Sequence, residues 1–200
     1  MRIFLLRHGE TDWNREGRLQ GHTDIPMNEN GTRQIREAGE YLLKEGESVN
    51  VIITSPLDRA RMSAEIIADQ IGYKKEDIII AEDFIERSFG EAEGLTIQER
   101  RMKYHGRDYP GMETVKELCE RAGSAMTKYI DKYTAGNILI VAHGAILKAV
   151  LAATSGGSMA YEDASLLIEP GSICMLEYEE GVFIRLNRTY KVSYIHPNTY

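Results

Sequence analysis

Four short runs of mainly apolar residues alternate with longer segments of helical periodicity along the chain. The runs cover residues 2–6, 49–54, 78–80 and 137–142. The helical segments cover residues 28–45, 57–71, 96–104, 113–133 and 144–153. Short runs rich in isoleucine and valine are typical of strands that are buried on both faces of a sheet. The alternation therefore predicts an α/β fold: a three-layer sandwich in which a mostly parallel central sheet carries helices on both faces.

Local signals mark where several of these elements begin and end. Asn28 or Asn30 can cap the first long helix, because a side-chain oxygen at that position accepts a hydrogen bond from the first turn. Ser55-Pro56 is typical of an N-cap followed by a first-turn proline, and it predicts the start of the helix over residues 57–71. Residues 173–178 and 182–186 flank Glu179-Glu180-Gly181 and predict a β-hairpin.

The composition fits one domain over residues 1–200. The chain has 200 residues, of which 42% are apolar, enough for one sizeable hydrophobic core. Its formal net charge of −7 argues against binding to nucleic acid or to an anionic membrane, because such proteins usually carry a basic excess. A small anionic ligand stays compatible with this charge, since a local arginine cluster can outweigh it.

We expect a cytoplasmic protein. The first apolar stretch, residues 3–6, is far too short for a signal peptide or a membrane span. The two cysteines, Cys119 and Cys174, form no CxxC pair. They could pair across the fold, but two buried free thiols in a reducing compartment fit the pattern better. The oligomeric state stays open, and a homodimer is among the alternatives.

Charged and polar residues follow three of the predicted strands. Arg7 and His8 follow the first strand, the segment 55–59 follows the second, and His143 and Gly144 follow the strand over residues 137–142. In folds of this class the ligand site lies beyond the carboxyl ends of the strands. The three segments are therefore expected to meet at one edge of the sheet.

The residues expected at this edge suit a phosphate group. Arg7 and Arg59 offer planar sets of donors for phosphate oxygens, and helix N-termini add free backbone N–H groups. A neutral histidine there can act as a nucleophile, while a second histidine, held protonated, would stabilise the transferring phosphoryl group. Glu86 follows the third strand and is the best candidate for the acid that protonates a leaving alkoxide. Bound phosphate nearby should raise the pKa of this carboxyl.

The sequence gives less support to a metal site, a serine hydrolase or a P-loop protein. A metal site built from His8, His143 and carboxylates is disfavoured by the fixed positive charges of the two arginines, and no HxH or HxxxH pair supplies a chelate. The sequence contains neither a GxSxG nor a GxxxxGK[ST] motif, so serine hydrolases and P-loop proteins are not indicated. His22 and His105 lack motif support and are expected to be loop residues.

Six ordered segments together resemble the histidine phosphatase superfamily, with its phosphoglycerate-mutase-like fold. They are LLRHGETDWN (5–14), QGHTDIPMNENG (20–31), SPLDRARMSA (55–64), ERSFGEAEG (86–94), PGMET (110–114) and VAHGAIL (141–147). The resemblance extends from the first residue to about residue 190. Ala92 and Met112 depart from the family pattern, which bears on substrate preference rather than on the catalytic groups.

The resemblance implies a role for each matching residue. His8 would be the phosphorylated nucleophile and Glu86 the proton donor, later acting as base for the attacking water. Arg7, Arg59 and His143 would complete the phosphate pocket. The implied substrate-binding set is Asn14, Gln20, Gly21, Thr23 and Gly144. The family needs no metal or other cofactor for this step, and none is expected here.

The expected function is a metal-independent phosphomonoesterase that hydrolyses a small phosphorylated metabolite through a phosphohistidine intermediate. The alternative is a cofactor-dependent phosphoglycerate mutase, in which Arg100, Arg101 and Lys103 could bind a carboxylate or second phosphate. The short segment over residues 94–110 favours the phosphatase. A non-catalytic phosphoester-binding protein is a third hypothesis. A lid over residues 91–126 is expected to select the substrate, whose identity the sequence leaves open.

Overall fold

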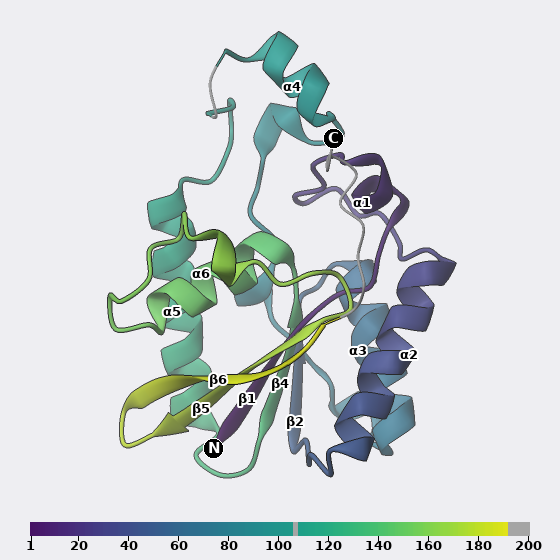
Figure 1. Cartoon of the computed structure of the whole chain (residues 1–200), viewed down its shortest axis with the longest axis vertical. Coiled ribbons are helices and arrows are strands. Elements are labelled where there is room, and N and C mark those ends of the chain that lie inside the picture. Colours follow the sequence, from purple (N-terminus) through teal and green to yellow (C-terminus); the bar gives the residue numbers. More distant parts are fainter. Residues whose placement is uncertain (106–107, 192–200) are drawn as a thin grey trace.

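The computed structural model describes residues 1–105 and 108–191, except for the side chains of residues 187–189. Its centre is a six-stranded mixed sheet with the strand order β3-β2-β4-β1-β5-β6 (Figure 1). The neighbouring strands from β3 to β1 pair in parallel, whereas β5 pairs antiparallel with both β1 and β6. The strands are β1 (Arg2–Arg7), β2 (Val51–Thr54), β3 (Ile79–Ile80), β4 (Ile138–Ala142), β5 (Ile173–Glu179) and β6 (Val182–Tyr190).

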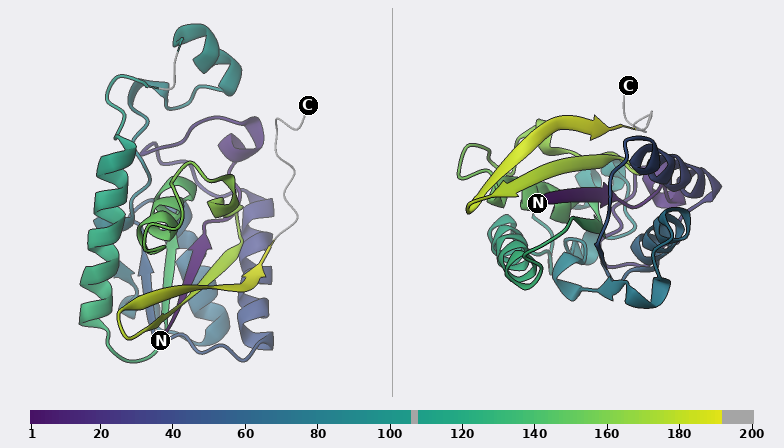
Figure 2. Two further views of the ribbon diagram at one scale, coloured as in Figure 1. Left: turned by 60° about the vertical axis from the view of Figure 1, so that its left-hand side comes forward. Right: turned by 90° about the horizontal axis from the view of Figure 1, so that it is seen from below.

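Helices cover both faces of this sheet, which confirms the predicted α/β sandwich. The α-helices are α1 (Asp12–Glu16), α2 (Glu29–Lys44), α3 (Asp58–Ile71), α4 (Ile97–Lys103), α5 (Val115–Lys132) and α6 (Gly144–Ala153). Short 3-10 helices occur at Lys75–Asp77, Glu82–Phe84, Gly90–Ala92 and Ala164–Leu166. The pair α2 and α3 packs on one face and the pair α5 and α6 on the other, as the view from below shows (Figure 2).

The side chains of β1 divide between the two faces because successive residues of a strand point in opposite directions. Ile3 and Leu5 join the apolar cluster beneath α5 and α6. Phe4 and Leu6 join the cluster beneath α2 and α3. All four side chains are inaccessible to solvent. The strand that leads to Arg7 and His8 is therefore fixed in the middle of the fold.

One predicted cap is confirmed and one is wrong. Asn28 caps α2, and its Oδ1 accepts a hydrogen bond from Gly31 N at 2.8 Å. Ser55 does not cap α3, which begins at Asp58 and has no capping side chain of its own. Asp24, from a distant loop, accepts the Asp58 N–H instead, with N···O distances of 3.0 and 3.1 Å.

The carboxyl ends of β1, β2 and β4 lie together, and α4 stands above them at the top of the molecule (Figure 1). The segment expected to form a lid, residues 91–126, thus contains α4 and also the first two thirds of α5. Leu118 and Ala122 of α5 belong to the core beneath α5 and α6. Among the helices of the described residues, none has both the length and the apolar character that a membrane crossing requires.

The loop after β1 touches the first turn of α2 at two glycines. A Cβ on Gly31 would overlap the backbone of Glu10, and a Cβ on Gly9 would overlap the carbonyl oxygen of Gly31. Backbones can approach this closely only where neither residue has a side chain. This contact fixes the path of the chain immediately after His8.

We expect Gly31→Ala to lower the free energy of unfolding by about 2 kcal/mol, because the added methyl overpacks a rigid backbone contact. In most helices the same change is stabilising, by up to about 1 kcal/mol. Gly123→Ala in α5 is the matched control, since its Cβ would lie 3.7 Å from Ala153 Cβ, an ordinary contact. Urea unfolding of both variants measures the effect. Equal stability of Gly31→Ala and wild type would contradict it.

Candidate active site

A pocket of about 310 Å³ opens at the carboxyl ends of the strands. Its lining contains eight of the ten site residues predicted from the sequence: Arg7, His8, Asn14, Gln20, Gly21, Arg59, Glu86 and Gly144. His143 and Thr23 are not part of this lining. The fold therefore brings together residues from five of the six sequence segments described above.

His8 has a defined tautomer. Its Nδ1 lies 2.7 Å from the carbonyl oxygen of Gly9. A carbonyl only accepts, so Nδ1 carries the hydrogen and Nε2 keeps a lone pair. The ring is 2% exposed, and burial together with the charges of Arg59 and Arg7 holds the pKa of His8 well below its usual value. His8 is thus a neutral imidazole with an unprotonated Nε2.

His143 is neutral too, which corrects the expectation of a protonated second histidine. Its Nδ1 accepts a hydrogen bond from Arg59 Nε at 3.2 Å, and a guanidinium can only donate. Its Nε2 therefore carries the hydrogen and donates to Ser55 Oγ at 2.7 Å. Burial and the charge of Arg59 hold the pKa of His143 well below the usual value. The Ser55 hydroxyl accepts this bond and also, at 3.4 Å, one from the backbone N–H of Leu57, the residue before α3.

Arg59 is the largest of the fully buried side chains. Besides its bond to His143, it donates to Gly21 O at 2.7 Å and to Thr23 O at 2.9 Å. Burial lowers the pKa of Arg59 to about 10, so the guanidinium stays charged at neutral pH. Two of its five N–H groups are not used by these bonds. A buried cation that lines the pocket attracts an anion.

Arg7 supplies a second cation and an unused donor. Its terminal nitrogen donates to Ile168 O at 2.9 Å. Its Nε is buried and has no hydrogen-bond partner among the described residues. The guanidinium packs on the first residue of α6, where a Cβ on Gly144 would lie 3.2 Å from Arg7 Cζ. Since buried donors are nearly always paired, this nitrogen points to an anionic ligand.

Glu86 sits at the N-terminus of α6. Its Oε1 accepts from the backbone N–H groups of Arg87, Ala145 and Ile146 at 2.9, 3.1 and 3.1 Å. Its Oε2 has one longer backbone contact, 3.3 Å from Ala145 N. Oε2 is therefore the carboxylate oxygen with the fewer backbone donors. His22, expected only as a loop residue, donates from Nε2 to the Glu86 carbonyl at 2.8 Å and so holds the backbone of this residue.

Amide side chains form another part of the wall. Asn14 belongs to the short helix α1, where its Oδ1 accepts from the backbone N–H of Thr11 at 3.1 Å. The Thr11 hydroxyl donates to Gln20 Oε1 at 2.9 Å. This bond fixes the orientation of the Gln20 amide, because its oxygen is turned toward Thr11. The sequence did not predict α1, since a five-residue helix is too short to show periodicity.

Glu93 organises the site although no motif in the sequence singles it out. Its carboxylate accepts from His22 N, Thr23 N, Thr23 Oγ1 and Phe89 N at 3.0, 2.9, 2.7 and 3.1 Å. A Cβ on Gly21 would overlap this carboxylate. Glu93 thereby joins the loop whose carbonyls hold Arg59 to the loop that carries Glu86. Its position in the ERSFGEAEG segment was the only signal, and two other glutamates share that segment.

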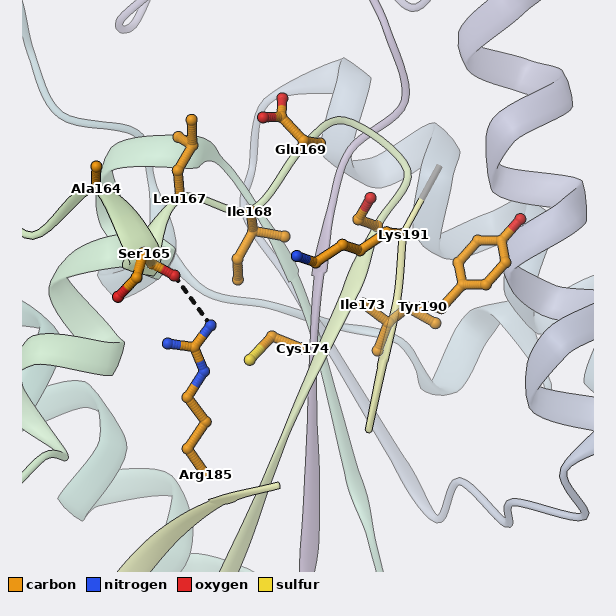
Figure 3. Close-up of a pocket in the computed structure, with 11 residues that line it drawn as sticks. Ala164, Ser165, Leu167, Ile168, Glu169, Ile173, Cys174, Arg185, Tyr190 and Lys191 are labelled. Atoms are coloured by element: carbon orange, nitrogen blue, oxygen red, sulfur yellow. Dashed lines mark hydrogen bonds between the residues drawn. The ribbon is translucent and has the colours of Figure 1, made fainter. Parts of the chain in front are cut away.

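A separate cavity of about 240 Å³, away from the candidate active site, lies between residues 164–173 and β6 (Figure 3). Its wall contains the Arg185 side chain, which donates to Ser165 O at 3.1 Å, and the Cys174 thiol. Burial raises the pKa of Cys174, so the thiol stays protonated and unreactive at neutral pH. Both cysteines are free, as expected, but only Cys174 is buried, since Cys119 is half-buried. The lining of this cavity contains no histidine.

We expect Glu93→Gln to weaken the binding of inorganic phosphate about tenfold, or about 1.4 kcal/mol. An amide NH₂ cannot accept a hydrogen bond, so half of the donors bound to Glu93 lose their partner. The loop whose carbonyls accept from Arg59 is then no longer held in place. Glu91→Gln is the matched control, because among the described residues that carboxylate contacts the Tyr104 hydroxyl and Lys103 Nζ and not the loop that holds Arg59. Isothermal titration calorimetry measures the affinity. Equal affinity in both variants would show that Glu93 does not position Arg59.

The chain is similar to proteins that are named as a phosphatase and as a probable phosphoglycerate mutase. The chain is 44% identical over 165 residues to a protein named uncharacterized phosphatase PhoE from Bacillus subtilis (strain 168), covering 82% of this chain and 83% of that one. It is 32% identical over 193 residues to a probable phosphoglycerate mutase, GpmB, from Klebsiella pneumoniae (strain 342), covering 92% and 88%.

A solved structure matches the fold over nearly the whole chain. The structure of Bacillus stearothermophilus YhfR superposes with a TM-score of 0.81 at 29% identity, covering 92% of this chain and 94% of that one. The family model described as histidine phosphatase superfamily (branch 1) matches residues 3–189. The chain therefore belongs to the histidine phosphatase superfamily.

Proposed function

We propose that this protein is a phosphomonoesterase that forms a phosphohistidine on His8. The observation that carries the proposal is the unprotonated Nε2 of a neutral, buried imidazole in a pocket lined by two guanidiniums. The only carboxylate that pairs with either guanidinium among the described residues is Asp24, 3.8 Å from a terminal nitrogen of Arg59. A phosphate ester would add negative charge beside both cations, and its phosphorus is the electrophile that the lone pair requires. The phosphatase name of the 44% identical relative supports this class of reaction.

In the first step, Nε2 of His8 attacks phosphorus and the bond between phosphorus and the ester oxygen breaks. The leaving alkoxide takes the proton held at Oε2 of Glu86. Arg7 and Arg59 neutralise the charge on the transferring phosphoryl oxygens, and the first N–H groups of α6 add to the positive field. The hydrogen bond from Nδ1 to Gly9 O stabilises the positive charge that develops on the ring.

In the second step, water attacks the phosphohistidine. Glu86, now ionised, takes a proton from that water while the bond between phosphorus and Nε2 breaks. Inorganic phosphate forms, His8 recovers its lone pair and Glu86 is protonated again. The charges that a metal ion supplies in other phosphotransferases are supplied here by arginines, so we propose a metal-independent reaction on a small phosphorylated metabolite.

A phosphoglycerate mutase is the alternative function, and the 32% identical relative named as a probable mutase favours it. In a mutase the phosphoryl group returns to a second substrate oxygen instead of passing to water. Exchange of phosphoryl groups that depends on added bisphosphoglycerate distinguishes the two activities. Release of inorganic phosphate without such exchange supports the phosphomonoesterase.

We expect His8→Ala to abolish hydrolysis of 4-nitrophenyl phosphate, because the nucleophile is lost while the anion pocket remains. The assay contains EDTA, and wild-type turnover is expected to resist it. Inorganic phosphate should still bind to the variant, which separates lost chemistry from a lost fold. Activity that EDTA removes, or full activity in His8→Ala, would refute the proposed mechanism.

We expect Glu86→Gln to slow hydrolysis of an alkyl phosphate at least tenfold more than hydrolysis of 4-nitrophenyl phosphate. Nitrophenolate leaves with little protonation, whereas an alkoxide needs a proton from the acid. The amide of the variant still fits at the start of α6 but cannot donate an acidic proton. Measured kcat/KM values for both substrates give the ratio. Equal losses on both substrates would count against the acid role of Glu86.

A further inference from the structure

A second pocket, of about 340 Å³, adjoins the proposed active site. Phe89 lines both pockets, and Arg87, which lines the second, directly follows Glu86 in the chain. The second pocket thus lies next to the acid that protonates the leaving group. A leaving group too large for the first pocket would extend past Phe89 into the second.

Three guanidiniums line this pocket: those of Arg87, Arg100 and Arg101. Within the described part of the chain, no ion pair forms to any of them. Such a concentration of positive charge without carboxylates is uncommon in a chain whose formal net charge is −7. The pocket is therefore an electropositive site on an acidic protein.

Three carboxylates of this region, those of Glu99, Glu113 and Glu91, bind other partners. Glu99 pairs with Arg18 at 3.4 Å and caps its own helix, α4. Glu113 makes two hydrogen bonds to Arg121, at 2.8 and 2.9 Å. Glu91 lies 3.8 Å from Lys103 Nζ. In α4, Lys103 thus lies toward the Glu91 carboxylate, whereas Arg100 and Arg101 line the pocket.

The remaining wall is apolar and well anchored. Phe89, Tyr109 and Met112 contribute side chains, and the backbones of Phe89 and Met112 form a β-bridge. The Arg87 guanidinium lies 5.6 Å from the Phe89 ring centroid and donates from Nε to Glu113 O at 2.8 Å. These contacts fix Arg87 and Phe89 relative to Glu86. The wall therefore offers a flat ring for an apolar substrate body and cations beyond it.

We propose that this pocket binds a second anionic group on the leaving group of the substrate. The inference rests on the phosphomonoesterase function proposed above and narrows its substrate class. The substrate is a phosphomonoester whose leaving group has an apolar or aromatic body next to Phe89 and ends in a carboxylate or phosphate. Arg100 and Arg101 bind that terminal anion, because a guanidinium matches the geometry of both groups.

The test compares aryl phosphates that differ only in a remote group. Phenyl phosphates with a 4-carboxymethyl or 4-carboxypropyl arm are assayed beside the corresponding amides, and a 4-phosphonomethyl arm distinguishes phosphate from carboxylate. The methylene insulates the ring, so leaving ability stays alike within each pair. We expect kcat/KM to be about tenfold higher for the anionic member of at least one pair, because charge-assisted hydrogen bonds to arginine form only there. The preference should weaken as salt is added.

Arg100→Gln/Arg101→Gln is expected to reduce this preference to less than twofold. The ratio of the two substrates is measured within each protein, so a general loss of activity cancels. Lys103→Gln removes a cation from the same helix and should keep both the activity and the preference. A wild-type ratio near one for every pair, with normal hydrolysis, would overturn the second anion site alone. A preference unchanged in the double variant would overturn its assignment to these arginines. Absence of hydrolysis for all substrates would overturn the proposed function itself.

Discussion

The burial of one guanidinium, that of Arg59, shapes the rest of the site. A charged group without solvent is strongly unfavourable unless its donors are paired. The chain meets this requirement with two loop carbonyls and the ring of His143. The partners come from the loop before α2 and from the end of β4, while Arg59 itself belongs to α3. Three segments that are distant in the sequence are therefore held together by one side chain, and the pocket exists because they meet.

The positive charge of Arg59 also explains why both histidines are neutral. Each ring is buried close to Arg59 and Arg7, so a further proton on either ring would add a third positive charge to a small volume. The rings stay neutral, and their hydrogen positions are set by fixed partners: Gly9 for His8, and Arg59 with Ser55 for His143. The pocket thus combines a neutral imidazole, whose Nε2 is unprotonated, with two guanidiniums. The proximity of these cations is what keeps the imidazole neutral.

Much of this arrangement could be predicted from the sequence. Apolar runs that end in Arg7-His8 and His143-Gly144 predict both the strands and the edge at which their following residues meet, because period and connection length determine these features. Features that depend on a distant partner could not be predicted. Asp24 accepts a hydrogen bond from the first residue of α3, which lies 34 residues further along the chain. Glu93 accepts hydrogen bonds from the backbone of residues 22 and 23, which lie about 70 residues before it. The tautomer of His143 follows from Arg59 and Ser55, which become its neighbours only in the folded chain.

The stretch that carries α4 is anchored at both ends. Gly94 N donates to Leu19 O at 2.8 Å, and Glu113 N donates to Ser88 O at 3.0 Å. Because both attachment points are fixed by the body of the protein, the stretch between them can change in length at little cost to folding, about 0.6 kcal/mol for each doubling of a flexible loop. Insertions or replacements there would alter the wall next to Glu86 while leaving Arg59, His8 and the sheet untouched. In this architecture the stretch that carries α4 can change during evolution while the residues at the carboxyl ends of the strands stay the same.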